Sequence, residues 1–167
     1  MNTTWWSPTV DDLWAWKAIR PLTKGAVLAR GQSNLQHLQS EYARIQSILG
    51  NRIPSLSNLS WKDVDALYHV ASKIKNVNSP VFGSKLCHFI MPDAFPVIDR
   101  NIIKKAKKVI GASALSYGHY WQFCKSQWVS CAARAQLVQT MQKAIGPNIF
   151  VHYPCAAKIT ELCISGS

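Results

Sequence analysis

The side chain with the clearest chemical possibilities is Asp99, which lies between an apolar stretch and a basic one. It follows four apolar residues, Phe95-Pro96-Val97-Ile98. An Asp in this place can cap a helix by accepting hydrogen bonds from the N–H groups of the next turn. It can also be a buried catalytic carboxylate, whose charge stabilises a positive transition state nearby. The two roles are compatible, and the sequence leaves both open.

Upstream, Gly83-Ser84-Lys85 is predicted to open a short helix over residues 84–91, after a turn at 76–83. The first backbone N–H groups of a helix have no partner within it, and such groups bind phosphate. Gly83 and Ser84 are therefore candidate phosphate contacts. The alternative is an ordinary helix cap at Ser84 that binds nothing.

Downstream, a predicted helix over residues 100–110 carries five cations: Arg100, Lys104, Lys105, Lys107 and Lys108. Its apolar residues share one face, so the cations project outward. A charged outer face can simply be solvated. However, no Asp or Glu lies between Arg100 and Lys143, so these cations suit a polyanion.

The elements that must position these residues are predicted to be helices, because apolar residues recur at alternating spacings of three and four. Ser60 and Asp63 have the spacing of a capping box, and glycines stop two of the helices. The only strand candidate is short, at residues 149–151. We expect an all-α globular fold of about seven helices rather than a coiled coil, with helices at 11–20, 34–49, 61–75, 84–91, 100–110, 118–145 and 154–164.

Composition predicts one compact helical domain spanning residues 1–167, because 48% of the chain is hydrophobic and only 16% is charged. The formal net charge of +11 favours polyanionic partners. No apolar run approaches the ~20 residues that span a bilayer, and residues 1–16 lack the pattern of a signal peptide. We therefore expect a monomer in the cytosol or nucleoid, with no membrane partner.

Five cysteines without a C-x-x-C pair predict reduced, buried thiols. Cys124 and Cys131 are seven residues apart and can share a helix face, where they either bind zinc or pack in the core. Core packing is the preferred interpretation. We expect no metal ion and no cofactor.

Two segments carry a resemblance to a known family. The run from Gly83-Ser84-Lys85 through Asp99 resembles the helix-hairpin-helix DNA glycosylases of the 8-oxoguanine glycosylase type. The chain is still more similar to small anti-phage glycosylases of this fold, which act on glucosylated hydroxymethylcytosine in DNA. There the matching pattern is Tyr153-Pro154 followed by Lys158-Ile159-Thr160-Glu161-Leu162-Cys163.

The resemblance covers residues 60–110 by motif and 150–166 more weakly, and residues 1–55 are not placed by it. One hairpin glycine is missing, since the usual Leu-Pro-Gly-Val-Gly reads Ser79-Pro80-Val81-Phe82-Gly83 here. The two matched functional residues, Lys85 and Asp99, are closer in sequence than is usual in the family. No four-cysteine run is present, so the iron–sulfur cluster of some relatives is not expected.

The resemblance implies that Lys85 is an amine nucleophile and Asp99 the essential carboxylate. An amine must lose its proton to attack, and desolvation in an apolar pocket lowers the pKa of a lysine. Phe82, Leu86 and Phe89 are the predicted walls of that pocket. If Lys85 is exposed instead, Asp99 would activate water and the enzyme would leave an abasic site.

A glycosylase must take its base out of the stack, so the site needs an aromatic or apolar slot for that base. Our candidates for contacts to the base or sugar are His88, Tyr117, Tyr120 and Trp6. His88 lies three residues after Lys85 on the same helix face. Each of these residues could instead be an ordinary packed side chain.

Together these features predict a DNA N-glycosylase that excises a modified base from double-stranded DNA in anti-phage defence. Its DNA contacts would come from Gly83, Ser84, Arg100, Lys104, Lys105 and Lys108. The first alternative is a repair glycosylase/lyase for oxidised guanine. The second is a non-catalytic helix-hairpin-helix module that binds DNA, and the third is a small toxin or structural helical protein.

Overall fold

The structure is a computed structural model that describes residues 3–75, 79–146 and 156–166. Across these residues the chain forms helices and no strand, which confirms the predicted all-α class. The described helices are α1 (Thr3–Ala15), α2 (Lys24–Leu49), α3 (Trp61–Lys75), α4 (Pro80–Ile90), α5 (Arg100–Ile110), α6 (Tyr117–Ser130), α7 (Arg134–Ile145) and α8 (Ala156–Gly166).

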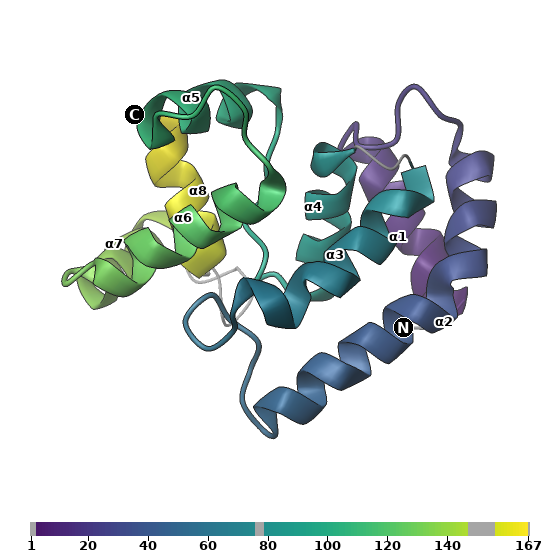
Figure 1. Cartoon of the computed structure of the whole chain (residues 1–167), viewed down its shortest axis with the longest axis horizontal. Helices are drawn as coiled ribbons and strands as arrows, with labels where there is room; N and C mark the ends of the chain where they lie inside the picture. Colours follow the sequence, from purple (N-terminus) through teal and green to yellow (C-terminus); the bar gives the residue numbers. More distant parts are fainter. Residues whose placement is uncertain (1–2, 76–78, 147–155, 167) are drawn as a thin grey trace.

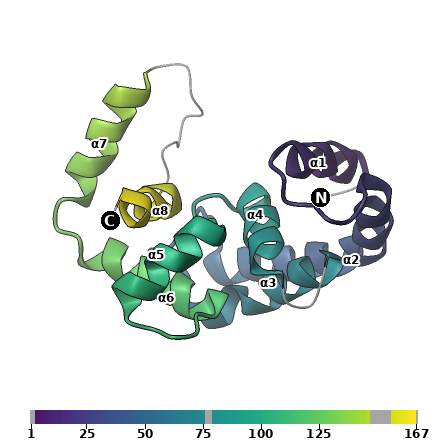
Figure 2. The same cartoon turned by 90° about the horizontal axis from the view of Figure 1, so that it is seen from above.

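The helices form two groups (Figure 1). Helices α1 to α4 pack on one another, whereas α8 packs against α5, α6 and α7. The same division is visible from above, in Figure 2. Contacts between α3 and α6 join the groups, and one cluster of buried apolar side chains extends from α1 to α8. The chain crosses between the groups in the segment 91–99, which ends at Asp99.

The boundaries of α3 and α5 are confirmed, and the reason is local capping. Before α3, both the backbone N–H and the hydroxyl of Ser60 donate to Asp63, at 2.7 and 2.6 Å. After α5, Gly111 adopts the left-handed conformation at φ 72°, which glycine accepts without strain. Signals of this kind lie within a few residues of the helix end, so the sequence alone reveals them.

Helix α1 differs from the predicted 11–20 helix, because it begins before Pro8 and ends at Ala15. The early turns bury Trp6, whose indole N–H donates to the carbonyl of Leu28 at 2.9 Å and whose ring lies against Gly31. Burying an indole stabilises the fold more than the one helical hydrogen bond that Pro8 removes. Helix α2 likewise begins ten residues earlier than predicted, because Thr23 caps it.

The predicted single helix over 118–145 is wrong. It is interrupted at Cys131, where the backbone turns extended, and α7 has no buried residue that would hold it in line with α6. The break makes eight described helices where about seven were expected. The predicted strand at 149–151 and the predicted first turn of the last helix at Pro154 lie outside the described residues.

Candidate active site

Asp99 caps α5, as the sequence predicted. One of its carboxylate oxygens accepts hydrogen bonds from the backbone N–H groups of Asn101 and Ile102, both at 2.8 Å. The side chain is half-buried and lines a cavity of about 350 Å³ that also contacts Lys105 and Ser165. Asp99 therefore lies at a cleft between the start of α5 and the end of α8.

Side-chain hydrogen bonds hold the backbone of the segment before Asp99 in place. Five successive backbone carbonyls, from Ala94 to Ile98, each accept a hydrogen bond from a side chain. The donors are Trp121 to Ala94 at 2.7 Å, His88 to Phe95 at 2.9 Å, Tyr117 to Pro96 at 2.7 Å, Tyr120 to Val97 at 3.1 Å and Ser84 to Ile98 at 3.4 Å. A buried loop must satisfy its backbone groups in some way, and here α4 and α6 do so. The position of Asp99 is consequently fixed from both helix groups.

His88, Tyr117 and Tyr120 bind the loop before Asp99, whereas the sequence predicted contacts to the base or sugar. Both tyrosine rings are buried and their hydroxyls are committed to the loop, so they are not available to a flipped base in this structure. The ring of His88 is bonded to Phe95, and burial lowers the pKa of the imidazole. Trp6 is completely buried in the core, so it cannot line a base pocket either.

Lys85 is buried, with 8% of its surface exposed. Its ammonium donates to the backbone carbonyl of Trp16 at 2.8 Å and lies 4.7 Å from the centre of the Trp16 ring. Burial lowers the pKa of Lys85, while the charges of Asp99 and Glu161 oppose that shift. Of the two alternatives that the sequence left open for Lys85, buried or exposed, the structure has the buried one.

None of the ion pairs between described residues joins Lys85 to Asp99, although the charge of Asp99 acts to raise the pKa of Lys85. Their helices are linked through Ser84, whose hydroxyl also accepts the N–H of Ile98 at 3.2 Å. The Lys85 amine on α4 is bonded to the α1–α2 connection at Trp16, whereas Asp99 lines the cleft between α5 and α8, which Lys85 does not line.

Trp16 is the residue of this site that the sequence did not single out. It belongs to the α1–α2 connection, its side chain is 37% exposed, and its ring packs edge-on against Phe89 at 5.5 Å. Of the three predicted pocket walls, Phe89 packs against Trp16, which in turn contacts the Lys85 ammonium. Phe82 and Leu86 are buried in the core. No local pattern placed Trp16 here, since its partners are about 70 residues away in sequence.

Gly83 and Ser84 do not open a helix, so the predicted free N–H groups are absent there. Helix α4 starts at Pro80, and the N–H of Gly83 donates to the carbonyl of Ser79 at 3.0 Å. Both residues are buried, and Gly83 lies against α3, where a Cβ on it would meet the hydroxyl of Ser72 at 2.1 Å. Glycine is needed here for helix packing. The hairpin residues 76–78 lie outside the described residues, and the helix-hairpin-helix motif stays a prediction.

Three of the five cations of α5 are exposed as predicted, whereas Lys105 and Lys107 are half-buried. Arg100, Lys104 and Lys108 are exposed, and Ile102 and Ala106 are buried on the opposite side. Lys105 is half-buried, and its ammonium donates to the carbonyl of Ser165. From Arg100 to Lys158 the sequence holds nine Lys and Arg residues and no Asp or Glu, and of these Lys158 is paired with Glu161.

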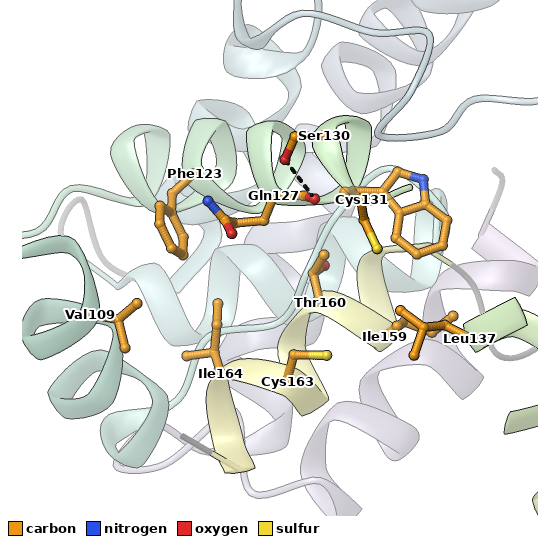
Figure 3. A pocket seen from close by; sticks show the side chains of 11 residues that line it. Val109, Phe123, Gln127, Ser130, Cys131, Leu137, Ile159, Thr160, Cys163 and Ile164 are labelled. Atoms are coloured by element: carbon orange, nitrogen blue, oxygen red, sulfur yellow. Dashed lines mark hydrogen bonds between the residues drawn. The ribbon is translucent and has the colours of Figure 1, made fainter. Parts of the chain in front are cut away.

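A separate cavity of about 450 Å³ lies between α6 and α8. Figure 3 shows Phe123 and Cys131 on one side of it, with Cys163 and Ile164 on the other. Among the described cysteines, Cys87 and Cys124 are buried, as predicted, whereas Cys131 is half-buried just past the end of α6 and Cys163 is exposed. No group of three metal-ligating side chains occurs in the described parts of the chain.

Comparison of this chain with protein-family models, with curated proteins and with solved structures finds no match. Within the described residues, no helix combines the length and the apolar character needed to cross a bilayer.

Proposed function

We propose that this protein is a DNA N-glycosylase that flips a modified base out of double-stranded DNA and cleaves its N-glycosidic bond. The observation that carries the proposal is the buried amine of Lys85, whose neighbour Ser84 is hydrogen-bonded to Ile98, the residue before Asp99. Cleavage of the N-glycosidic bond builds positive charge on the deoxyribose, which a fixed carboxylate stabilises. The exposed cations of α5 begin directly after Asp99 and suit the flanking phosphates.

The proposed reaction uses Lys85 as the nucleophile. Its unprotonated amine forms a bond to the anomeric carbon while the bond from that carbon to the base breaks. The bonding electrons leave with the base, which takes up a proton, and the amine loses one. The resulting adduct rearranges to a Schiff base, which permits strand cleavage. With Asp99 acting alone on water, the same site would leave an abasic site.

Trp16 takes the place of Trp6 as our candidate for stacking on the flipped base. Its ring is partly exposed and lies directly beside the Lys85 ammonium. Aromatic faces stack on bases with little dependence on sequence. Because Trp16 also covers Lys85, the α1–α2 connection has to shift when the sugar reaches the amine.

The proposed substrate is DNA with glucosylated hydroxymethylcytosine, and the proposed setting is anti-phage defence. This choice rests on the resemblance of residues 158–163 to the small anti-phage glycosylases. Oxidised guanine is the second substrate to test.

A second candidate function, a non-catalytic DNA-binding module, is favoured by a specific contact. Lys75 donates to the carbonyls of Ala18 and Arg20 at 2.7 and 2.6 Å, just as Lys85 donates to Trp16. Two ammonium groups therefore hold the same connection, and in this interpretation Lys85 is purely structural.

The test compares the wild-type protein with Asp99→Asn on glucosylated duplex DNA. Asn still accepts the capping hydrogen bonds, so we expect unchanged DNA affinity and no abasic sites. The matched control is Asp93→Asn, which alters the other carboxylate of the same loop and should leave abasic-site formation at the wild-type rate. Abasic sites at the wild-type rate with Asp99→Asn would exclude the proposed role of Asp99.

Borohydride trapping then distinguishes the two chemistries. A covalent DNA adduct that is lost in Lys85→Gln supports the Schiff base. Base release without any adduct assigns the reaction to water activated at Asp99 and removes Lys85 from the chemistry.

A further inference from the structure

The end of α1 exposes two indole rings, those of Trp14 at 38% and Trp16 at 37%. The proposed function uses Trp16 but not Trp14. Among the described residues, the aromatic and cation–π contacts of Trp14 are limited to one, with the guanidinium of Arg20 at 5.9 Å from the ring centre. Single exposed apolar side chains are common, whereas exposed aromatic rings gathered at one place are typical of a binding surface.

The same segment is rich in cations and poor in acidic residues. Over residues 13–40 the chain has four Lys and Arg residues and no Asp or Glu. Lys24 pairs with Asp11. Lys17 and Arg20 are exposed, and neither makes an ion pair with a described residue. Two exposed cations without an acidic partner therefore accompany the two exposed indoles.

Lys17 stands where the backbone favours glycine. Helix α1 ends in a Schellman motif, in which the N–H of Ala18 donates to the carbonyl of Leu13 at 2.9 Å. The N–H of Lys17 donates to the carbonyl of Trp14, also at 2.9 Å. Among the described residues, Lys17 is the one non-glycine residue with a positive φ, at 55°. Glycine would avoid this strain, and what the lysine adds is an exposed positive charge.

The backbone that carries these side chains is fixed from two other helices. The ammonium of Lys75 on α3 donates to the carbonyls of Ala18 and Arg20 at 2.7 and 2.6 Å. The ammonium of Lys85 on α4 donates to the carbonyl of Trp16 at 2.8 Å. The indoles and cations are therefore held in position before any ligand arrives, which lowers the conformational entropy lost on binding.

Indole rings beside unpaired cations suit a strand of nucleic acid whose bases are accessible. Bases stack on aromatic rings, and phosphates attract cations. In an intact duplex the base faces are covered by their neighbours, so the rings cannot reach them. An anionic membrane also attracts indoles and cations. Here, however, each ring lies against a cation, and moving a charge into an apolar layer is costly.

We propose that Trp14, Trp16, Lys17 and Arg20 form a surface that binds unpaired DNA, with the indoles on the bases and the cations on the phosphates. The choice of DNA as the nucleic acid rests on the proposed function, but binding at this surface needs no chemistry. The surface belongs to the group of helices α1 to α4, whereas α5 belongs to the other group (Figure 1). Unpaired nucleotides thus bind apart from the phosphates that α5 contacts.

The experiment measures binding of the full-length protein to a fluorescent, unmodified oligothymidylate by anisotropy. Trp14→Ala should weaken binding about fivefold or more, because a stacking partner of one base is lost. Trp14→Phe keeps an aromatic face and should restore most of the affinity. The matched control is Ile53→Ala, which removes another exposed apolar side chain, between α2 and α3, and should leave the affinity unchanged.

Lys17→Gly keeps the proposal testable if Trp14→Ala does not fold. Glycine relieves the strained backbone, so the thermal midpoint should not fall. Loss of the cation should nevertheless reduce the log–log salt dependence of oligothymidylate binding by about 0.7 for one phosphate on a single strand. The matched control is Lys62→Gln, which changes an exposed lysine about 20 Å along α3 from Lys75 and should leave the salt dependence unchanged.

The outcomes separate this inference from the proposed function. Unchanged affinity in Trp14→Ala, or unchanged salt dependence in Lys17→Gly, overturns the inference even if base release is intact. Tighter binding of the wild-type protein to vesicles of anionic lipid than to oligothymidylate overturns it in favour of a membrane surface. Weakened oligothymidylate binding in both variants of a protein that releases no modified base supports the surface and overturns the glycosylase.

Discussion

Asp99 has two functions that substitutions can separate, because its cap needs an acceptor oxygen and its proposed chemistry needs a charge. We expect Asp99→Asn to keep the free energy of unfolding within about 0.5 kcal/mol of wild type. Asp99→Ala, which lacks the acceptor for the two backbone N–H groups, should lose about 1 kcal/mol. Neither variant should release base. Urea denaturation checks the first two values, and equal losses in both variants would contradict the capping account.

His88 should make stability depend on pH in the mildly acidic range. Burial lowers its pKa in the folded protein below the ordinary value of 6.5, so the unfolded chain binds a proton more readily. The stability is therefore complete above pH 6.5 and is lost as the pH falls through the folded pKa. Asn in place of His88 can still donate to Phe95, and the free energy of unfolding should depend less on pH between 7 and 5.

The control for this prediction is His119→Asn, which changes an exposed histidine on α6. Its pH dependence should match that of the wild-type protein. If the free energy of unfolding of His88→Asn depends on pH as steeply as that of the wild-type protein, the imidazole does not titrate in the way described.

At the scale of elements, the loop before Asp99 is held by hydrogen bonds from side chains of α4 and α6. Removing the hydroxyl of Tyr117 leaves the buried carbonyl of Pro96 without its donor. Tyr117→Phe should therefore cost about 1–3 kcal/mol in thermal or urea unfolding, and it should slow base release because Asp99 is less firmly held. The matched control is Tyr42→Phe on α2, since the Tyr42 hydroxyl makes no hydrogen bond in the described part of the chain.

The α1–α2 contact gives a sharper test of packing. A Cβ on Gly31 would lie 1.8 Å from the ring of Trp6, which is completely buried and cannot move aside. Gly31→Ala should therefore lower the free energy of unfolding by about 1–3 kcal/mol or more. On the same helix, Gly25 has no neighbour within 4 Å, and Gly25→Ala should be neutral or stabilising by up to about 1 kcal/mol. Similar effects of the two substitutions would contradict this contact.

These elements also indicate what the sequence can predict. The caps at Asp63, Asp99 and Gly111 act within one helical turn, so α3 and α5 were predicted with correct ends. The early start of α1 depends on Trp6 meeting α2, and no pattern inside α1 reports that contact. The apolar spacing of 118–145 continues across Cys131, but nothing buries α7, so the pattern predicted a longer helix than exists.

In the candidate site, too, local features could be predicted from the sequence and contacts between distant segments could not. Asp99 and Lys85 were identified from the sequence because cap position and resemblance are local properties. The partners of Tyr117, Tyr120 and Trp16 are more than 20 residues away in sequence. Only the fold decides whether an aromatic side chain lines a pocket or holds a loop, and the sequence could not distinguish the two for these residues.

At the scale of the whole molecule, charge is distributed unevenly along the chain. All the carboxylates except Glu161 lie at or before Asp99, whereas cations continue to Lys158. If α5 binds DNA phosphates, neutralising Lys104, Lys107 and Lys108 together should reduce the log–log salt dependence of duplex binding by about 0.9 for each phosphate that the variant no longer neutralises. Fluorescence anisotropy at several salt concentrations measures this slope.

The control for the salt dependence is Lys24→Gln on α2. Lys24 already pairs with Asp11, so its removal should leave the slope unchanged. An unchanged slope in the triple variant would place the DNA-binding surface elsewhere on the protein.

The central claim is that Lys85 and Asp99 together break a glycosidic bond, and mass spectrometry of free bases tests it most directly. The wild-type protein is incubated with a panel of modified duplex DNAs that includes glucosylated phage DNA and DNA with oxidised guanine. We predict release of one modified base, glucosylated hydroxymethylcytosine, and no release with Asp99→Asn. Salt-dependent binding of every DNA without release of any base would contradict the claim and identify the protein as a binding module.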